Sequence, residues 1–513
     1  MIYTLEAGDG GLAFDLDGMD LADPIWTNGS NVRFESGYFQ PFDGHARLYD
    51  PPSVTPYGVF PFTTTSASIW VYTSLTAAYT VDNSGTHTNI TRASPYTATA
   101  DTKWTGGALT SYLIFNNAND VPQSWDGNTS NDAADLANWI STWRCKAIRP
   151  LRNYLVAVNI TKTSTNYPVM VKWSHSADPG ALPSSWDETD PALDAGEVDL
   201  ADATGPLVDV VPLGDLGIIY STGAYHSMQY IGGNDIWRFT RISGDCGALS
   251  QNCAVQYPGG HVVLTPGDVV THAGGAPRSV IDRRMRKSLF NLLDAANFAR
   301  AFVVHNETKS EAWICIPEPS QPSCTRAYIW NYAQDSWSVR EIPGVSAGAL
   351  GPVVTSSPDT WATISGTWDA LSGPWDGTSI DASRRRVVLA SPLKQRLYLP
   401  DTGTSFDGWS SGSMYVERTG LSLGNPSRMK FVRAVRPRVD ALTGTQVTVK
   451  VGGALTADGP YSWGVPSTYI VGTSIQADVR ATGRYIGVKF ESSIGEPWRC
   501  RSMDIEFEFA GER

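Results

Sequence analysis

The sequence predicts an all-β protein whose largest part is a β-propeller and whose C-terminal part is a β-sandwich. Three observations favour this fold class. The 513 residues include 48 Gly and 32 Pro but only 18% charged residues, which is typical of short strands and tight turns. A pattern of apolar strand, polar turn and aromatic strand recurs at intervals of about 40 to 60 residues. The last predicted strand alternates strictly between apolar and polar residues.

Residues 1–50 are expected to form an N-terminal arm of short strands. Residues 26–34 have the pattern of a strand, Gly37 supplies a turn, and a second strand extends toward Gly44. This segment precedes the repeating part of the chain.

Residues 51–350 are expected to form the propeller. Its strands are apolar runs that each precede or contain a tryptophan or tyrosine, and examples lie at residues 69–72, 112–115, 154–158, 216–220 and 301–304. The spacing suits four-stranded blades whose aromatic side chains pack blade against blade. The pattern does not specify the number of blades.

One short helix is expected within residues 283–298, where Leu289, Leu292 and Leu293 can line one face. Two interpretations are open. The helix can pack on a blade edge, or its basic residues can contact DNA or a partner. We favour the first because helices of globular proteins normally bury one apolar stripe.

Residues 351–410 are expected to form a loop or linker that carries a tryptophan repeat. Trp361, Trp368 and Trp375 are seven residues apart, but the Ser-Gly pairs and a proline between them exclude a long helix. Stacked turns or short hairpins are therefore expected, as a projecting loop or an inter-subunit contact.

Residues 411–513 are expected to form the β-sandwich. In the last strand Met503, Ile505 and Phe507 point to one side, while acidic residues alternate with them on the other. Such alternation is required of an antiparallel strand with one buried face.

No catalytic residue, cofactor site or metal site is predicted. The seven histidines are scattered, and neither Cys246 and Cys253 with His261 nor Cys315 with Cys324 has the spacing of a structural zinc site. Nucleophile-elbow, P-loop and dinucleotide-binding motifs are not found. The six cysteines are expected to be buried free thiols, as in a protein made in a reducing cytoplasm.

Two acidic features have both a structural and an enzymatic interpretation. Asp178, in a Ser-x-Asp-x-Gly sequence, resembles the Asp-box of sialidase-type propellers, where the aspartate stabilises a turn. Asp187, Glu188 and Asp190 are expected to form a solvated acidic loop. A carboxylate pair for glycoside hydrolysis stays open because it needs no sequence motif.

The formal net charge of −12 argues against a protein that wraps nucleic acid, although it permits one that guides DNA without adhesion. The basic features are residues 384–386 and the strand at 428–438, for which an inter-subunit contact or a solvated face is preferred to DNA. No signal peptide and no membrane span are expected.

Several motifs, taken in order, resemble a known family. The most telling is at residues 31–34, followed by Gly37, and others lie at 232–239, 311–314, 329–332 and 368–376. In these the chain is similar to the podovirus-type tail nozzle proteins of bacteriophages, also called tail tubular protein B or tail accessory factor. The last third matches only as a generic sandwich.

The resemblance implies a non-enzymatic structural subunit of the virion tail, made in the bacterial cytoplasm. It implies a homo-hexameric ring of propeller subunits below the portal and adaptor, through whose lumen genomic DNA passes without specific binding. It further implies tail fibres, spikes or a needle as partners.

Two alternatives stay open. The first is a glycan-binding or glycan-cleaving propeller that acts on host surface polysaccharide, which clustered acids in one central pocket would favour. The second is a secreted eukaryotic propeller, for which glycosylation triplets lie at Asn28, Asn89, Asn128, Asn159 and Asn306.

Overall fold

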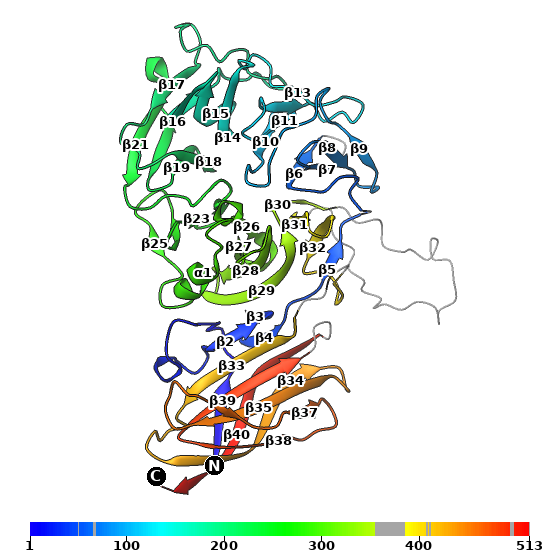
Figure 1. The fold of residues 1–513 in the computed structure, drawn as a ribbon, viewed down its shortest axis with the longest axis vertical. Coiled ribbons are helices and arrows are strands. Elements are labelled where there is room, and N and C mark those ends of the chain that lie inside the picture. The colour runs from blue at the N-terminus through cyan, green and yellow to red at the C-terminus, as the bar shows by residue number, and fades with distance from the viewer. Residues whose placement is uncertain are drawn as a thin grey trace, which may run out of the picture.

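The protein is built almost entirely of short antiparallel strands, which confirms the predicted all-β class (Figure 1). The structure is a computed structural model that describes residues 1–49, 51–64, 68–353, 385–406, 409, 412–492 and 497–511. Within these residues it has one α-helix, α1 (Arg286–Leu292). The short 3-10 helices are η1 (Gly18–Asp20), η2 (Gly233–Asp235), η3 (Phe298–Arg300) and η4 (Glu307–Lys309).

Seven four-stranded antiparallel units form the propeller, six as separate sheets and one as the first part of a larger sheet. Blade 1 consists of β6 (Gly58–Thr63), β7 (Ser68–Thr73), β8 (Ala78–Val81) and β9 (His87–Asn89). Blade 2 consists of β10 (Thr105–Leu109), β11 (Tyr112–Asn116), β12 (Gln123–Trp125) and β13 (Ala134–Asp135). Blade 3 consists of β14 (Trp143–Leu151), β15 (Tyr154–Lys162), β16 (Thr165–Trp173) and β17 (Gly196–Asp199).

Blades 4 to 7 follow the same plan, except that the last takes its outer strand from the start of the chain. Blade 4 consists of β18 (Leu207–Leu213), β19 (Leu216–Ser221), β20 (Tyr225–Tyr230) and β21 (Trp237–Ser243), and blade 5 of β22 (Ala254–Tyr257), β23 (Gly260–Leu264), β24 (Val269–His272) and β25 (Arg278–Ser279). Blade 6 consists of β26 (Phe302–Asn306), β27 (Glu311–Ile316), β28 (Cys324–Asn331) and β29 (Ser336–Val345). Blade 7 consists of β30 (Ala347–Pro352), β31 (Arg385–Ser391), β32 (Arg396–Pro400) and β5 (His45–Arg47).

The ring is closed around its axis by the first strand of each blade. Each of these strands contacts the first strand of the next blade, and β30 contacts β6. The N-terminal strand β5 pairs with β32, so residues near the start of the chain complete the seventh blade. This pairing joins the two ends of the propeller within one blade.

The sandwich consists of two sheets that also take strands from the N-terminal segment (Figure 1). One sheet contains β1 (Ile2–Glu6), β4 (Tyr38–Pro41), β40 (Trp498–Gly511), β34 (Met429–Ala441) and β38 (Ala477–Gly483), and continues through β3 (Val32–Glu35) into blade 6. The other contains β2 (Asn28–Ser30), β33 (Met414–Leu421), β39 (Tyr485–Ser492), β35 (Gln446–Ala454), β36 (Ser462–Trp463) and β37 (Ser467–Ile470).

The alternation predicted for the last strand is confirmed. Met503, Ile505 and Phe507 of β40 are buried, whereas Asp504 and Glu508 on the opposite side reach solvent. The apolar face lies in a hydrophobic core that runs from the sandwich into blades 4, 5 and 6.

Two expected boundaries differ from the structure. Residues 1–50 do not form a separate arm, because their strands are distributed between the sandwich and blade 7. Residues 385–400, expected in a linker, form β31 and β32 of blade 7. The tryptophan repeat at 361–377 lies outside the described residues.

The helix lies where the sequence predicts it but is shorter than the expected segment. It ends at Leu292 because Asp294 starts a new turn, in which its carboxylate accepts a hydrogen bond from the backbone N–H of Ala296 (3.0 Å). Leu289 is buried, which fits the packed interpretation, but Phe298 is largely exposed. In the described part of the chain, no helix combines the length and apolarity needed to cross a bilayer.

Candidate functional site

The two domains are joined by a continuous hydrogen-bonded sheet. Val32 of β3 pairs with Val339 of blade 6 on one side and with Pro41 of β4 on the other. From β4 the sheet continues into β40, where Phe39 is opposite Cys500. Propeller and sandwich are therefore connected by backbone pairing and not only by a flexible tether.

A buried ionic cluster lies beside this junction. Arg33 of β3 donates to both carboxylate oxygens of Glu311, at 2.8 and 3.1 Å, and to Asp401 at 2.7 Å. Arg340 donates to the other oxygen of Asp401, also at 2.7 Å. Two guanidinium groups thus meet two carboxylates, and the cluster ties together the N-terminal segment, blade 6 and the chain that follows blade 7.

The electrostatics of this ionic cluster favour its charged form. Burial opposes charge on Asp401, but Arg33 and Arg340 outweigh that cost and hold the pKa of the Asp401 carboxyl well below its usual value. Burial and the charge of Arg340 lower the pKa of His45, which therefore stays neutral beside the cluster. Removing one member would leave a buried charge without its partner.

The N-terminal segment crosses blade 6 in close contact with Trp337. The backbone N–H of Leu12 donates to the carbonyl oxygen of Trp337 (2.9 Å). A Cβ atom on Gly11 would lie 2.4 Å from the Trp337 nitrogen, and Gly11 has φ +70°. Only glycine fits this crossing without strain.

The family-like motifs near the N-terminus and in blade 6 meet at this junction. Residues 31–34 comprise Asn31 and the first three residues of β3. Residues 311–314 lie on β27, and the first of them, Glu311, belongs to the ionic cluster. Residues 329–332 lie at the end of β28 in the same sheet. Residues 232–239 lie elsewhere, at the outer edge of blade 4, and residues 368–376 lie outside the described residues. Two motifs far apart in the chain are therefore in direct contact through Arg33 and Glu311, which are separated by 278 residues.

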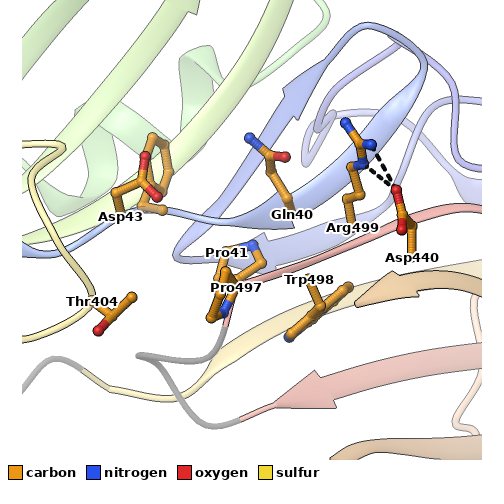
Figure 2. A pocket seen from close by; sticks show the side chains of 9 residues that line it. Gln40, Pro41, Asp43, Thr404, Asp440, Pro497, Trp498 and Arg499 are labelled. Carbon is orange, nitrogen blue, oxygen red and sulfur yellow. Dashed lines mark hydrogen bonds and ion pairs between the residues drawn. The ribbon is translucent and has the colours of Figure 1, made fainter. Parts of the chain in front are cut away.

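A small hollow of about 220 Å³ lies beside the junction, and Figure 2 shows the side chains that line it. Gln40 and Pro41 of β4 line it together with Trp498 and Arg499 of β40, the strand that pairs with β4 in the same sheet. Arg499 forms an ion pair with Asp440 (2.6 Å), and both side chains are more than half exposed.

Side chains tie the blades together near the propeller axis. Arg149 of β14 donates two hydrogen bonds to the fully buried Asp209 of β18, each 3.0 Å long, and one to the carbonyl oxygen of Gly106 in β10. Asp209 also accepts from the backbone N–H of Asn252 (2.9 Å). This axial network connects blades 2, 3 and 4 to the start of blade 5.

A hollow of about 490 Å³ opens where the first strands of blades 2 to 5 begin, and we call it the loop-face hollow. Its lining includes Arg144 and Lys146 at the start of β14. Asp and Glu are absent from the described residues that line it. The sequence suggested none of these residues, because they come from separate blades and share no motif.

A larger groove of about 1050 Å³ lies beside α1 and combines apolar with basic side chains. Leu16, Phe290 and Phe298 supply apolar surface, and Arg286 and Lys287 supply charge. The carboxylate of Asp15 accepts a hydrogen bond from the backbone N–H of Lys287 (2.8 Å), which fixes the N-terminal segment against the helix.

The predicted acidic loop borders an outer groove between blades 3 and 4. Glu188 and Glu197 both pair with the fully buried ammonium of Lys172, at 2.6 and 3.1 Å. Burial opposes ionisation of Glu188, but its hydrogen bond with Lys172 gives a net lowering of its pKa. Trp237 and Phe239 line the same groove. A general acid in glycoside hydrolysis needs a raised pKa, which is the opposite direction.

Asp178 does not stabilise its turn in the way an Asp-box would. The turn is closed by its carbonyl oxygen, which accepts from the backbone N–H of Ala181 (3.0 Å), and no hydrogen bond to the Asp178 side chain is found in the described part of the chain. The resemblance to an Asp-box therefore stops at the sequence.

Of the histidine and cysteines without zinc-site spacing, His261, Cys253 and Cys324 are hydrogen bonded within the protein. Both ring nitrogens of His261 are hydrogen bonded, one to the hydroxyl of Tyr220 (2.7 Å) and one to the carbonyl oxygen of Pro212 (2.8 Å). The Cys253 thiol donates to the carbonyl oxygen of Ala301. All six cysteines are free and buried, as expected from the sequence.

The basic strand 428–438 lies on β34 beside the acidic face of β40. Arg433 pairs with Glu508 (2.7 Å), Arg438 pairs with Asp504 (3.2 Å), and Arg436 pairs with Glu506. The charges of these three arginines are thus compensated within the chain, as on a solvated face. Of residues 384–386, Arg385 lies 3.9 Å from Glu307, Arg386 donates to the carbonyl oxygens of residues 400 and 401, and Arg384 lies outside the described residues.

Comparison with known proteins adds no functional assignment. No protein-family model and no curated protein matches the chain. Similar solved structures include the computationally designed Ika8 protein (9% identity, 72% of this chain and 95% of that chain, TM-score 0.37) and the WD40 β-propeller domain of Doa1 (11%, 71% and 97%, 0.38). A third is PorZ of the type-IX secretion system of Porphyromonas gingivalis (11%, 83% and 46%, 0.33). At these TM-scores the similarities carry no argument about function.

Proposed function

We propose that this chain is the structural subunit of a short-tailed bacteriophage tail nozzle, a homo-hexameric ring that encloses the channel for DNA ejection. The observation that carries the proposal is the junction, where two of the family-like motifs contact each other through Arg33 and Glu311. If the resemblance were a coincidence of turn and packing residues, motifs far apart in the sequence would not be expected to meet at one buried site.

The junction suits a subunit that must hold its shape when DNA moves past it. The shared sheet and the buried ionic cluster resist rotation of the sandwich relative to the propeller. A non-enzymatic role in the virion needs this rigidity more than a reactive group. In this proposal the neighbours are the portal and adaptor above and fibres, spikes or a needle below.

The DNA channel in this proposal lies between subunits. Near the axis of a single propeller, Arg149, Asp209 and Asn252 form hydrogen bonds between neighbouring blades, and duplex DNA needs a lumen of about 20 Å. One repeated heterologous interface closes into a ring when its rotation fits. The net charge of −12 suits a lumen that repels phosphate and so does not hold the genome.

The test is the mass and symmetry of the purified full chain, alone and mixed with its candidate adaptor, by light scattering and electron-microscope class averages. We expect a six-fold ring with an open lumen, at least in the presence of the adaptor. A monomer in both conditions would sink the proposal.

A glycan-active propeller is the competing function, and the outer groove between blades 3 and 4 is the feature that favours it. There Trp237 and Phe239 lie near Glu188, as aromatic and acidic side chains do in sugar sites. A monomer that binds or shortens host polysaccharide, and loses this on Trp237→Ala, would replace the nozzle proposal with this one.

A further inference from the structure

The loop-face hollow contains positive charge that no carboxylate of its described lining compensates. Its volume of about 490 Å³ is within the range of small-molecule sites. It is lined by residues from blades 2 to 5 and by neutral polar groups, among them Ser250 and Gln251. In a chain with a net charge of −12, a pocket of this kind is unusual.

Lys146 is the central cation of the hollow. Its side chain is half-buried, and in the described part of the chain its ammonium has no hydrogen-bond or ion-pair partner. Burial, followed by the nearby charge of Lys103, lowers its pKa. An ammonium in this position gains from a bound anion, which would replace part of its lost hydration.

Lys103 adds a second charge behind the hollow. It is buried, and its ammonium donates to the hydroxyl of Ser250 (3.1 Å) and to the carbonyl oxygens of Gln251 (2.8 Å) and Ala301. These three acceptors match the three donors of an ammonium, and all are neutral. The charge is therefore solvated by the protein without being cancelled.

Arg144 supplies a third charge at the hollow. Its guanidinium donates to the carbonyl oxygens of Asn119 (2.8 Å), Ser141 (2.8 Å) and Trp143 (2.7 Å), which are again neutral acceptors. The acid that acts on Lys146, Asp101, is already paired with Arg300 at 2.7 Å. Two cations thus line the opening and a third lies behind it, and the described lining contains no carboxylate.

We propose that the loop-face hollow binds a small organic anion, a carboxylate or a phosphate monoester, through a direct ionic contact with Lys146. Lys103 and Arg144 contribute to the positive potential, and the neutral polar lining accommodates the uncharged part of the ligand. This inference goes beyond the nozzle proposal and does not depend on it, because the site lies within one propeller.

The test is isothermal titration calorimetry of the full chain with three sugars that share the glucose ring: glucose 6-phosphate, glucuronate and neutral glucose. We expect at least one of the two anions to bind and glucose not to bind. The anion that binds identifies the acidic group. Binding of glucose as tight as that of the anions, or no binding of either anion, would overturn the proposal.

Variants locate the binding. Lys146→Met should weaken the anion about 10-fold or more, as expected for the loss of a charge-assisted hydrogen bond. Lys394→Met, at a half-buried lysine on the turn between β31 and β32, should leave the affinity within about twofold. Lys146→Gln provides a second variant if Lys146→Met does not fold. Unchanged affinity in a folded Lys146 variant would mean that the lysine only extends to solvent.

Discussion

At the scale of single residues, the buried charges at the junction explain why this chain keeps ionic groups in its core. Arg33 is almost completely buried, and it satisfies its charge with carboxylates from two distant parts of the chain. Such a cluster adds little net stability relative to an apolar core, but it specifies one arrangement, because each charge can be compensated only in the native geometry.

The first prediction concerns Asp401. Asp401→Asn removes the carboxylate that Arg33 and Arg340 share, so the two buried guanidinium groups keep Glu311 and, 3.9 Å from Arg33, the half-exposed Asp43. We expect the free energy of unfolding to fall by about 3–5 kcal/mol, measured by urea denaturation. Asp440→Asn, at the exposed pair with Arg499, should leave the free energy of unfolding nearly unchanged, because solvent screens that pair. Equal effects of the two substitutions would contradict the structural role of the cluster.

The second prediction concerns pH. Burial lowers the pKa of His261 to about 4, and burial with the charge of His261 lowers that of His272 to about 4. The unfolded chain, with histidine pKa near 6.5, therefore binds more protons between these values. Stability should fall as pH decreases from about 6.5 toward 4. Urea unfolding at pH 7.0, 5.5 and 4.5 measures this decline.

A matched pair of variants assigns the decline to these rings. His272→Phe keeps the stacking on Tyr225, whose ring centroid lies 4.4 Å away, but cannot be protonated. Its stability should depend less on pH than that of the parent chain. His175→Gln, at a partly exposed ring, should keep the full decline. If His272→Phe shows the parent's slope, the decline has another origin.

At the scale of elements, the N-terminal segment is the part of the chain that joins the two domains. Its strands pair with β40, β33, β29 and β32, so it belongs to the sandwich and to two blades. By contrast, β34 and β40 compensate their charges between two paired strands, since arginines of β34 form ion pairs with acidic residues of β40. Cross-strand pairs of this kind stabilise a sheet without a partner molecule.

The third prediction tests how tightly the N-terminal segment docks. Gly11 and Gly37 both have positive φ. Gly11→Ala places a Cβ atom against the Trp337 backbone, whereas the Cβ atom of Gly37→Ala, at φ +80°, would meet no heavy atom within 4 Å. Gly37→Ala should therefore cost only backbone strain, about 1 kcal/mol. Gly11→Ala should cost at least about 2 kcal/mol more in the same denaturation experiment. Equal costs would mean that the segment is not held against blade 6.

At the scale of the whole molecule, the continuous sheet makes propeller and sandwich one mechanical unit. One hydrophobic core also extends from the sandwich into blades 4, 5 and 6. Separate domains joined by a linker normally move relative to each other, but a shared sheet and core oppose such motion. The proposed role in a ring around a channel would need this property.

The fourth prediction follows from that unity. Differential scanning calorimetry of the full chain should show one cooperative transition, in which the calorimetric and van't Hoff enthalpies agree. Asp401→Asn should lower the temperature of that transition without dividing it, because the β3 pairing remains. Two resolved transitions in the parent chain would show that the domains unfold independently.

The candidate site could be predicted only in part. The motifs around Arg33, Glu311 and Trp337 stand out in the sequence, but nothing in their spacing indicates that they meet. Lys146 is an ordinary lysine by sequence, and its unpaired charge follows from the neighbours that other blades bring. The acidic loop is visible in the sequence as a cluster of carboxylates, but the ion pair between its Glu188 and Lys172 depends on the fold.

The sequence alone determined the features that depend on neighbouring residues. These are the all-β class, the alternation along β40, the position of α1 and the absence of strong catalytic motifs. The tertiary structure decided the seven blades, the use of β5 to close the ring, the division of the N-terminal segment and the uncompensated charge at Lys146. The reason is physical: periodicity and turn chemistry act over a few residues, whereas strand partners and buried charges are chosen by segments hundreds of residues apart.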